Sequence, residues 1–391
     1  MTNIKEIDKT FVAGTYARFP VTLTKGEGSY LWDDAGKRYI DMGTGIAVNT
    51  FGVGDKAWIE ATTAQLSALQ HTSNLYYTEP CAVLAKLLCE KTGFKKVFFG
   101  NSGAEANECA IKAARKYAAE KKGEDYFTIV TLEQSFHGRT ITTLAATGQD
   151  TFHTKFLPLT EGFVHTPAND LAAMEKVLCE HKIAAVMMEC VQGEGGVRTL
   201  TKEFVQGVAK LCKEKDILLI IDEVQTGNGR TGKLYAYMHY DIMPDIITTA
   251  KGLGGGLPIG ATLLGEKVQD IYAPGDHGST FGGNPVSCAG AVSILERLDD
   301  ALLSEVSEKS RFIIENLEGA KGIESVSGLG LMLGIKTVKP AGEVLAACRE
   351  KGVLCLTAKD KVRLLPALNI PMDALKEAVE IIKEVCGEDV E

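Results

Sequence analysis

The chain has 391 residues, with 42 lysines and arginines against 51 aspartates and glutamates, so its formal net charge is −9. An acidic chain is not expected to bind nucleic acid as a main partner, because phosphate binding requires a basic face. Hydrophobic residues make up 45% of the chain and charged residues 24%, which indicates an ordinary globular protein and excludes a disordered one.

The sequence also disfavours a membrane protein, a secreted protein and a metal enzyme. The longest aliphatic run, Ile217 to Ile221, is far shorter than the roughly 20 residues of a membrane span. The N-terminal sequence MTNIKEIDKT is polar and has no apolar signal core. The ten cysteines and seven histidines are scattered, which predicts free thiols and no zinc site. We therefore expect a cytoplasmic protein.

The first predicted element is a hairpin over residues 25–41, with its turn at Asp34-Ala35-Gly36. Short apolar runs follow, and segments with helical periodicity separate them. Runs of this length, bounded by glycine and polar residues, are typical of buried parallel strands. The expected strands are residues 96–99, 126–130, 183–188, 217–221 and 245–249, and the expected helices are 105–122, 170–181 and 202–214. This alternation predicts an α/β fold with a mainly parallel sheet.

The pattern changes from about residue 285. Long helices and short strands are expected at residues 285–299, 302–317, 331–336 and 362–365. This order indicates a second, α+β domain. We expect a large domain of residues 50–284, and a small domain formed by both ends of the chain, residues 1–49 and 285–391.

Ligands in open α/β sheets bind beyond the C-terminal ends of the strands. After the strand at 96–99, Ser102 and Glu105 have capping-box spacing, which predicts a helix start. The small residues Gly103 and Ala104 would let a phosphate reach the free N–H groups there, although a plain glycine-rich turn explains the pattern equally well. This segment carries neither the Gly-Lys-Ser/Thr nor the G-x-G-x-x-G pattern, so neither ATP nor NAD is expected to bind here.

Charged residues follow two other predicted strands. Asp222 comes after the aliphatic run, where a carboxylate needs a cationic or N–H partner to stay charged; on its own, a helix cap or an ion pair would explain it. Lys251 follows the strand at 245–249 and precedes a run of glycines. A lysine in such surroundings can have a lowered pKa and stay accessible, as a Schiff-base nucleophile requires. The alternative is a surface lysine in a flexible loop.

Three further residues complete the candidate site. Phe136 could stack on a flat ring and Arg139 could bind a carboxylate; the alternatives are a core phenylalanine and a surface arginine. Thr280 could donate to a phosphate or lie in a turn. His137 is assigned no proton transfer, because a solvated or structural histidine explains it as well. A phosphate site, a stacking ring, a carboxylate and a lysine together fit one cofactor, pyridoxal phosphate (PLP).

Four segments in this order resemble the class III aminotransferases of PLP fold type I: residues 101–107, 135–139, 222–227 and 249–252. The resemblance covers nearly the whole chain. It implies a large domain with a mainly parallel, seven-stranded-type sheet, a smaller α+β domain, and a homodimer with shared active sites. Residues 45–50, 71–77 and 363–368 are similar to the acetylornithine aminotransferase subgroup. That similarity implies transfer of the δ-amino group of N-acetylornithine to 2-oxoglutarate, giving N-acetylglutamate semialdehyde and glutamate, in arginine biosynthesis.

The resemblance implies a role for each cofactor-binding residue. Lys251 would bond to the aldehyde of PLP and later move a proton, and Asp222 would hold the pyridinium N–H. Gln225 would contact the ring hydroxyl and Phe136 would stack on the ring. The phosphate would be bound by Ser102, Gly103 and Ala104, and by Thr280 of the neighbouring subunit.

The substrate residues are implied in the same way. Arg139 and Ser279 would contact acetylornithine. Arg363 would bind the α-carboxylate of glutamate or 2-oxoglutarate, and Glu194 would neutralise Arg363 when the donor has a terminal amine.

Other activities remain open at this stage. Ornithine, 4-aminobutyrate and succinyl-diaminopimelate fit the same motifs as amine donors. An aminomutase or a decarboxylase is a second alternative, because a fold does not fix its reaction, and a non-catalytic binding protein is a third. The sequence departs from the family pattern at Cys190, where proline is common, and at Asn228, where an apolar residue is frequent. These departures bear on donor preference.

Overall fold

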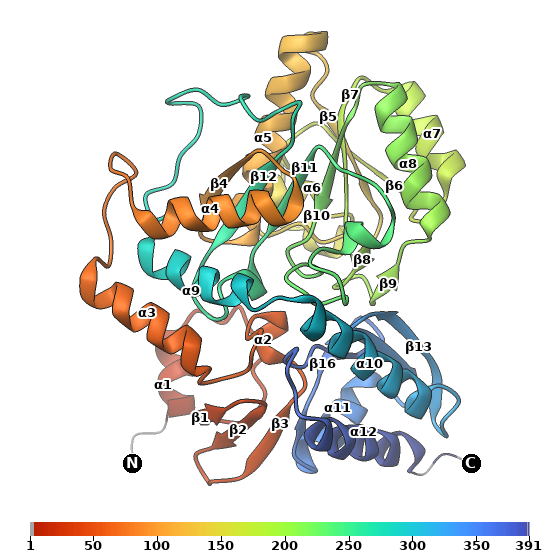
Figure 1. Cartoon of the computed structure of the whole chain (residues 1–391). Helices are drawn as coiled ribbons and strands as arrows, with labels where there is room; N and C mark the ends of the chain where they lie inside the picture. Colours follow the sequence, from red (N-terminus) through yellow and green to blue (C-terminus); the bar gives the residue numbers. More distant parts are fainter. Residues whose placement is uncertain (1–3, 389, 391) are drawn as a thin grey trace.

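The computed structural model of the chain describes residues 4–388 and 390. Figure 1 shows an upper part built around a large sheet and a lower part that contains both ends of the chain. The strands of the large sheet lie in the order β4-β12-β11-β10-β7-β5-β6. Their bounds are Lys96–Gly100, Gly260–Leu264, Ile246–Thr249, Leu218–Asp222, Ile183–Met188, Thr128–Leu132 and Phe163–Thr166.

This sheet confirms the predicted α/β fold. Strands β10, β11, β7, β5 and β6 pair in parallel, whereas β12 runs antiparallel to both of its neighbours. All residues of β7 and β10 are buried, as their unbroken apolar sequences predict for strands covered on both faces. The five predicted strands are present, with β5 starting two residues later than expected; β6 and β12 were not predicted.

Helices cover both faces of the large sheet (Figure 1). Helix α5 packs on one face, where its alanines meet Leu218 and Ile220 of β10. Leu219 and Ile221 point to the other face and join a core cluster with Phe204 of helix α8. From α3 to α9 the helices are α3 Lys56–Ala68, α4 Glu79–Thr92, α5 Gly103–Lys122, α6 Ile141–Ala146, α7 Leu171–Glu180, α8 Lys202–Glu214 and α9 Pro285–Glu296.

The lower part holds two smaller sheets. The predicted hairpin is a three-stranded meander of β1 (Leu23–Glu27), β2 (Tyr30–Asp33) and β3 (Arg38–Asp41), and the C-terminal strand β15 (Val353–Leu354) pairs with β3 in parallel. The second sheet has the order β13-β14-β17-β16, with bounds Ile323–Leu329, Met332–Thr337, Lys361–Leu364 and Leu356–Ala358. Helices α10 Asp300–Leu317, α11 Ala341–Glu350 and α12 Met372–Gly387 pack near these sheets.

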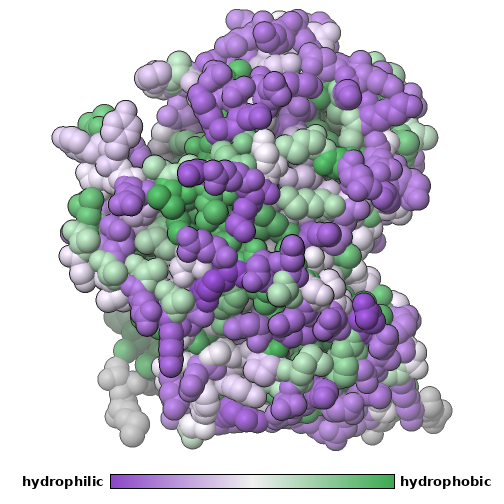
Figure 2. Space-filling view, in the orientation of Figure 1, coloured by the Kyte–Doolittle hydropathy of each residue, from purple (hydrophilic) through white to green (hydrophobic). Residues whose placement is uncertain are grey.

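The remaining elements are short or lie near the N-terminus: α1 Ile4–Phe11, α2 Thr44–Ala47, β8 Val191–Gln192, β9 Arg198–Thr199, and the 3-10 turns η1 Asp150–Phe152, η2 Ala236–His239 and η3 Lys251–Leu253. Figure 2 shows hydrophilic residues over most of the visible face and an indentation on the right between the upper and lower parts. Within residues 4–388 and 390, no helix combines the length and apolar character that crossing a bilayer requires.

Candidate active site

A cavity of about 410 Å³ lies at the C-terminal ends of the large-sheet strands, the edge where ligands of such sheets bind. Segments that follow β4, β5, β7, β10 and β11 all contribute to its wall. We call it the active-site cavity. Eight of the twelve predicted site residues line it: Ser102, Gly103, Ala104, Phe136, Arg139, Asp222, Gln225 and Lys251.

The turn from β4 into α5 carries the three residues that were predicted to bind a phosphate, and it lines the cavity. Helix α5 begins at Gly103, and the Ser102 hydroxyl caps it by accepting a bond of 3.2 Å from the Glu105 N–H. A Cβ atom on Gly103 would lie 2.6 Å from Cγ1 of Val224, so a larger residue would displace the chain that follows Asp222. The first N–H groups of a helix have no partner inside the helix. Those of α5 border the cavity and suit a phosphate.

Asp222 is buried at the end of β10, with 3% of its surface exposed. Its Oδ2 lies 2.8 Å from both the Asn107 amide nitrogen and His137 Nδ1, and its Oδ1 accepts a bond of 2.9 Å from the Val224 N–H. These contacts fix the carboxylate at the cavity wall. His137 is therefore structural rather than solvated, since its side chain is fully buried.

Lys251 follows β11 and lines the cavity, where it is half-buried. Burial lowers the pKa of its amino group to about 8, although the nearby Glu194 carboxylate acts in the opposite direction. Its backbone has a φ of 45°, a left-handed conformation that is strained for a residue other than glycine. Two buried side chains hold the turn: Asn228 donates to the Ala250 carbonyl at 3.2 Å, and Thr50 to the Gly252 carbonyl at 2.7 Å. The alternative of a surface lysine in a flexible loop is thus excluded.

Phe136 and Arg139 lie on the segment after β5. The Phe136 N–H donates to Glu189 at 3.0 Å, and the Arg139 guanidinium lies over the Phe152 ring, 4.5 Å from its centre. Arg139 has an exposed side chain and no ion pair within the described part of the chain. It is free to bind a carboxylate at the cavity mouth.

Glu194 and Arg363 meet beside the cavity wall. Arg363 Nη1 lies 2.6 Å from Glu194 Oε1 and 3.1 Å from Gln225 Oε1, and the Gln225 amide donates to Glu194 at 3.3 Å. Burial raises the pKa of the Glu194 carboxyl, but the charge and hydrogen bond of Arg363 outweigh this and leave the pKa below its ordinary value. The Glu194 carboxylate is therefore charged at neutral pH.

Ser279 and Thr280 do not line the cavity of their own chain. The Ser279 hydroxyl accepts bonds from the Asn101 amide at 3.1 Å and from the Gly282 N–H at 3.0 Å, while Thr280 is exposed. A Thr280 that serves the neighbouring subunit, as predicted, need not line the cavity of its own chain.

The sequence analysis missed two buried groups in this site. Asn107 bridges Asp222 and Thr248, whose hydroxyl donates to the Asn107 amide oxygen at 2.6 Å. Glu189 lines the cavity directly after β7. Its burial, together with the nearby Asp222 charge, raises the pKa of its carboxyl well above the ordinary value. The position of Glu189 at a strand end was the signal that could have found it.

The residues present fit PLP. A half-buried lysine, a fixed carboxylate and a helix start line one cavity, and these are the kinds of group that its aldehyde, pyridine nitrogen and phosphate require. The sequence model of the aminotransferase class III family matches residues 11–386. The chain belongs to this family.

Known class III aminotransferases resemble the chain over their whole length. The acetylornithine aminotransferase of Haemophilus ducreyi is 51% identical over 98% of both chains, and that of Caldanaerobacter subterraneus is 44% identical over 97% of this chain and 98% of its own. Among solved structures, the ornithine aminotransferase of Toxoplasma gondii, with PLP at its active site, has a TM-score of 0.94 and 31% identity over 98% of this chain and 94% of its own. The acetylornithine aminotransferase of Elizabethkingia anophelis has a TM-score of 0.87 and 34% identity over 98% and 97%.

Proposed function

We propose that this class III aminotransferase binds PLP and transfers the δ-amino group of N-acetylornithine to 2-oxoglutarate, forming N-acetylglutamate semialdehyde and glutamate, in arginine biosynthesis. The observation that carries this proposal is the 51% identity, over 98% of both chains, to an acetylornithine aminotransferase. The similarity of shape does not separate donors, since an ornithine aminotransferase has a TM-score of 0.94 with this chain. Ornithine is therefore the main competing donor, followed by 4-aminobutyrate and succinyl-diaminopimelate.

The residues of the cavity suit the two halves of a transamination. PLP supplies an electron-withdrawing ring that makes a substrate C–H bond acidic. Lys251 Nζ would bond the cofactor between turnovers and would carry the proton from the substrate carbon. Asp222 would keep a proton on the pyridine nitrogen, and Phe136 would stack on the ring. Ser102, Gly103 and Ala104 would bind the phosphate.

The Glu194–Arg363 pair supports the use of two different substrates in one site. A donor that reacts at its terminal amine has no carboxylate on the reacting carbon, so Arg363 needs another anion, and Glu194 supplies it at 2.6 Å. 2-Oxoglutarate brings an α-carboxylate that can replace Glu194 as the partner of Arg363. Arg139 at the cavity mouth would take the distal carboxylate or the α-carboxylate of acetylornithine, and Ser279 would contact the same donor.

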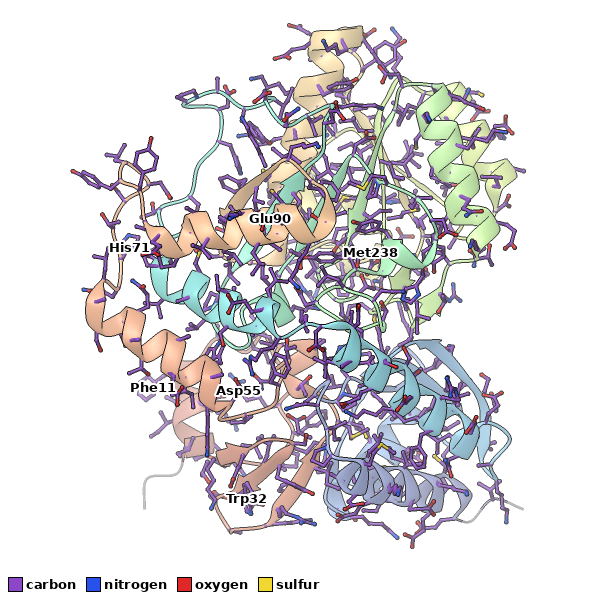
Figure 3. All side chains as sticks on the ribbon, viewed as in Figure 1. Phe11, Trp32, Asp55, His71, Glu90 and Met238 are labelled. Carbon is purple, nitrogen blue, oxygen red and sulfur yellow. The ribbon has the colours of Figure 1, made fainter. Side chains whose placement is uncertain are left out.

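We also propose that the protein acts as a homodimer with shared active sites, in the cytoplasm. The loop between α3 and α4 projects from the body of the chain, and Figure 3 labels His71 near its start. It exposes Leu75, Tyr76 and Tyr77. Asn74 joins this loop to the Ser279 and Gly282 carbonyls at 3.0 and 2.9 Å. A second copy that covered this surface would bury the apolar residues and receive Thr280 near its phosphate.

A division into two domains, residues 50–284 and residues 1–49 with 285–391, belongs to the same proposal. It is supported by the pairing of Val353 with Ile40, which joins the ends of the chain in one sheet.

The half-reaction with the donor tests the activity. Purified protein loaded with PLP is mixed with N-acetylornithine, ornithine, 4-aminobutyrate or succinyl-diaminopimelate, without 2-oxoglutarate, and the visible absorbance of the cofactor is followed. Rapid loss with N-acetylornithine and slower loss with the others supports the proposal. Faster loss with another donor assigns that donor instead. Turnover that needs no keto acid, or release of CO2, would point to an aminomutase or a decarboxylase.

A further inference from the structure

Arg230 is a buried arginine without a carboxylate partner. It lies in the turn that follows β10, and 2% of its surface is exposed. Its Nη1 donates to the carbonyls of Leu331 at 3.1 Å and Pro366 at 2.5 Å, and no ion pair to it is found within the described residues. Burial lowers the pKa of its guanidinium to about 9. A buried cation that only carbonyls compensate is costly, so its place in the structure calls for an explanation.

The turn that carries Arg230 is fixed to the lower part of the molecule. The Leu331 N–H donates to the Arg230 carbonyl at 2.9 Å, and a Cβ atom on Gly229 would lie 2.8 Å from the Leu368 side chain. Residues 227–232 have the spacing of the G-x-G-x-x-G pattern, but no α-helix begins there. The turn therefore serves as a contact between the two parts rather than as a phosphate site.

The two carbonyls that Arg230 binds stand opposite each other. In the antiparallel pair of β14 and β17, Leu333 faces Leu364 and Gly334 faces Arg363. Continued by two residues, this register places Leu331 opposite Pro366. Arg230 thus closes the end of the ladder that carries Arg363. Nη1 can donate to both carbonyls because each terminal nitrogen of a guanidinium carries two N–H bonds.

A second contact joins the same two segments. Gln225 lies five residues before Arg230 and accepts from Arg363, which lies three residues before Pro366. The segment that carries Asp222 and Gln225 is thereby attached to the strand of Arg363 at two points. The contact at Gln225 includes substrate-binding groups, whereas the contact at Arg230 lies outside the active-site cavity.

We propose that Arg230 is a positioning residue for Arg363. By closing the end of the β14–β17 ladder, Arg230 holds Arg363 in place and so sets the affinity of the site for a dicarboxylate acceptor. This inference rests on the proposed function in taking 2-oxoglutarate as the acceptor. When an incoming carboxylate replaces Glu194, the ion pair that holds Arg363 is lost. The attachment at Arg230 does not depend on substrate and remains.

Lys309 offers a matched control. It is 5% exposed, and its Nζ donates to the Leu368 carbonyl at 2.9 Å and pairs with Glu305 at 3.0 Å. It is thus a second buried cation bound to the loop after β17, but it makes no hydrogen bond to residues 222–231. Loss of Lys309 should destabilise the loop without moving Arg363 relative to Gln225.

The test uses the PLP-loaded wild type and the variants Arg230→Met, Arg230→Lys and Lys309→Met. The dissociation constant of glutarate, a five-carbon dicarboxylate that cannot react, is measured by calorimetry. KM for 2-oxoglutarate, the rate of the N-acetylornithine half-reaction and the melting temperature are measured alongside. For Arg230→Met we expect the glutarate dissociation constant and the acceptor KM to rise about tenfold, and the donor half-reaction to change by less than about twofold. Arg230→Lys should lie between Arg230→Met and the wild type. Lys309→Met should lower the melting temperature and keep wild-type glutarate binding.

Wild-type glutarate affinity in folded Arg230→Met or Arg230→Lys would overturn the inference. So would equal slowing of the donor and acceptor steps, an equal loss of affinity in Lys309→Met, or a wild type that does not bind glutarate. An error in the proposed donor can be told apart from an error in the role of Arg230. If the donor is wrong, the wild type will not react with N-acetylornithine, while the comparison of glutarate binding still decides the role of Arg230.

Discussion

Arg363 and Glu194 form an ion pair of 2.6 Å beside the active-site cavity, and Gln225 contacts both partners. Arg363 is only 3% exposed, so it needs an anion at all times, because an unpaired buried charge is costly. The Glu194–Arg363 ion pair is therefore the arrangement expected when no substrate carboxylate is bound to Arg363. Each substrate either leaves it intact or replaces Glu194.

Substitution of Glu194 should separate the two half-reactions. In Glu194→Gln we expect the reaction with N-acetylornithine to slow about tenfold, because Arg363 has lost its partner, while the reaction with glutamate keeps its rate or becomes faster. The two rates are measured separately from the cofactor absorbance. Glu203→Gln, on the exposed side of α8, is the control and should change neither rate. Equal slowing with both substrates would refute this role for Glu194.

Lys251 should be the residue that bonds PLP. Reduction of the loaded protein with borohydride, followed by digestion and mass spectrometry, should place the cofactor mass on the peptide that contains Lys251. Lys251→Ala should lose turnover by about a thousandfold or more, since the nucleophile and the proton carrier are one group. A cofactor mass on another lysine, or biological function retained by Lys251→Ala, would contradict the assignment.

Asp222 and His137 should differ in the size of their effects. Asp222→Asn removes the charge that holds the pyridinium proton, and its amide would face the donors of Asn107 and His137; we expect turnover to fall about a thousandfold. His137→Asn can still donate to Asp222, so the loss should be about tenfold or less. Steady-state rates of the two variants at saturating PLP make the comparison. A larger loss in His137→Asn would mean that the histidine takes part in the chemistry.

The lowered pKa of Lys251 predicts how the stability of the cofactor-free protein depends on pH. The pKa falls from 10.5 to about 8 on folding. Between these values the unfolded chain binds a proton at this amine that the folded chain does not, so the contribution of Lys251 to the free energy of unfolding rises with pH. Denaturant titrations of wild type and Lys251→Ala from pH 7 to 10 measure it as their difference. A difference that stays constant over this range would exclude a lowered pKa.

A hybrid dimer tests whether sites are shared. Lys251→Ala and Thr280→Asp are each expected to be inactive, the second because a carboxylate would repel the phosphate of the partner's cofactor. In a mixed dimer one site would carry both changes and the other neither. Refolding an equal mixture should then restore about a quarter of wild-type activity. No recovery in verified mixed dimers of two inactive variants would show that Thr280 serves the site of its own chain.

The sequence predicted the positions of the strands in the large sheet better than the directions in which they run. Strands such as β7 and β10 are buried on both faces, and an unbroken apolar run reveals such a strand without knowledge of its neighbours. Strand β12 begins at a glycine and runs opposite to the strands beside it. Its direction depends on the path of the chain after Lys251, which no local pattern encodes.

Some residues of the candidate site could be predicted from the sequence, and others could not. Lys251, Asp222 and Gly103 follow predicted strands, and strand ends converge in this fold, so their meeting could be predicted. Glu189 also follows a predicted strand and could have been found in the same way, whereas the contacts of Asn107 and His137 with Asp222 could not, because they depend on how α5 packs against the large sheet. Ser279 and Thr280 belong to a loop whose place is set by tertiary contacts such as that of Asn101 with Ser279.

The parallel pairing of Ile40 with Val353 constrains how the chain acquires its structure during synthesis. The meander β1–β3 leaves the ribosome early, yet its partner β15 follows roughly 300 residues later, about 15 to 60 s at ordinary rates of translation. During that interval the edge of β3 is open, and it could pair with another nascent chain. The large sheet is complete before β15 emerges, so the enzyme's active-site lysine and aspartate can be assembled while its two ends have yet to meet.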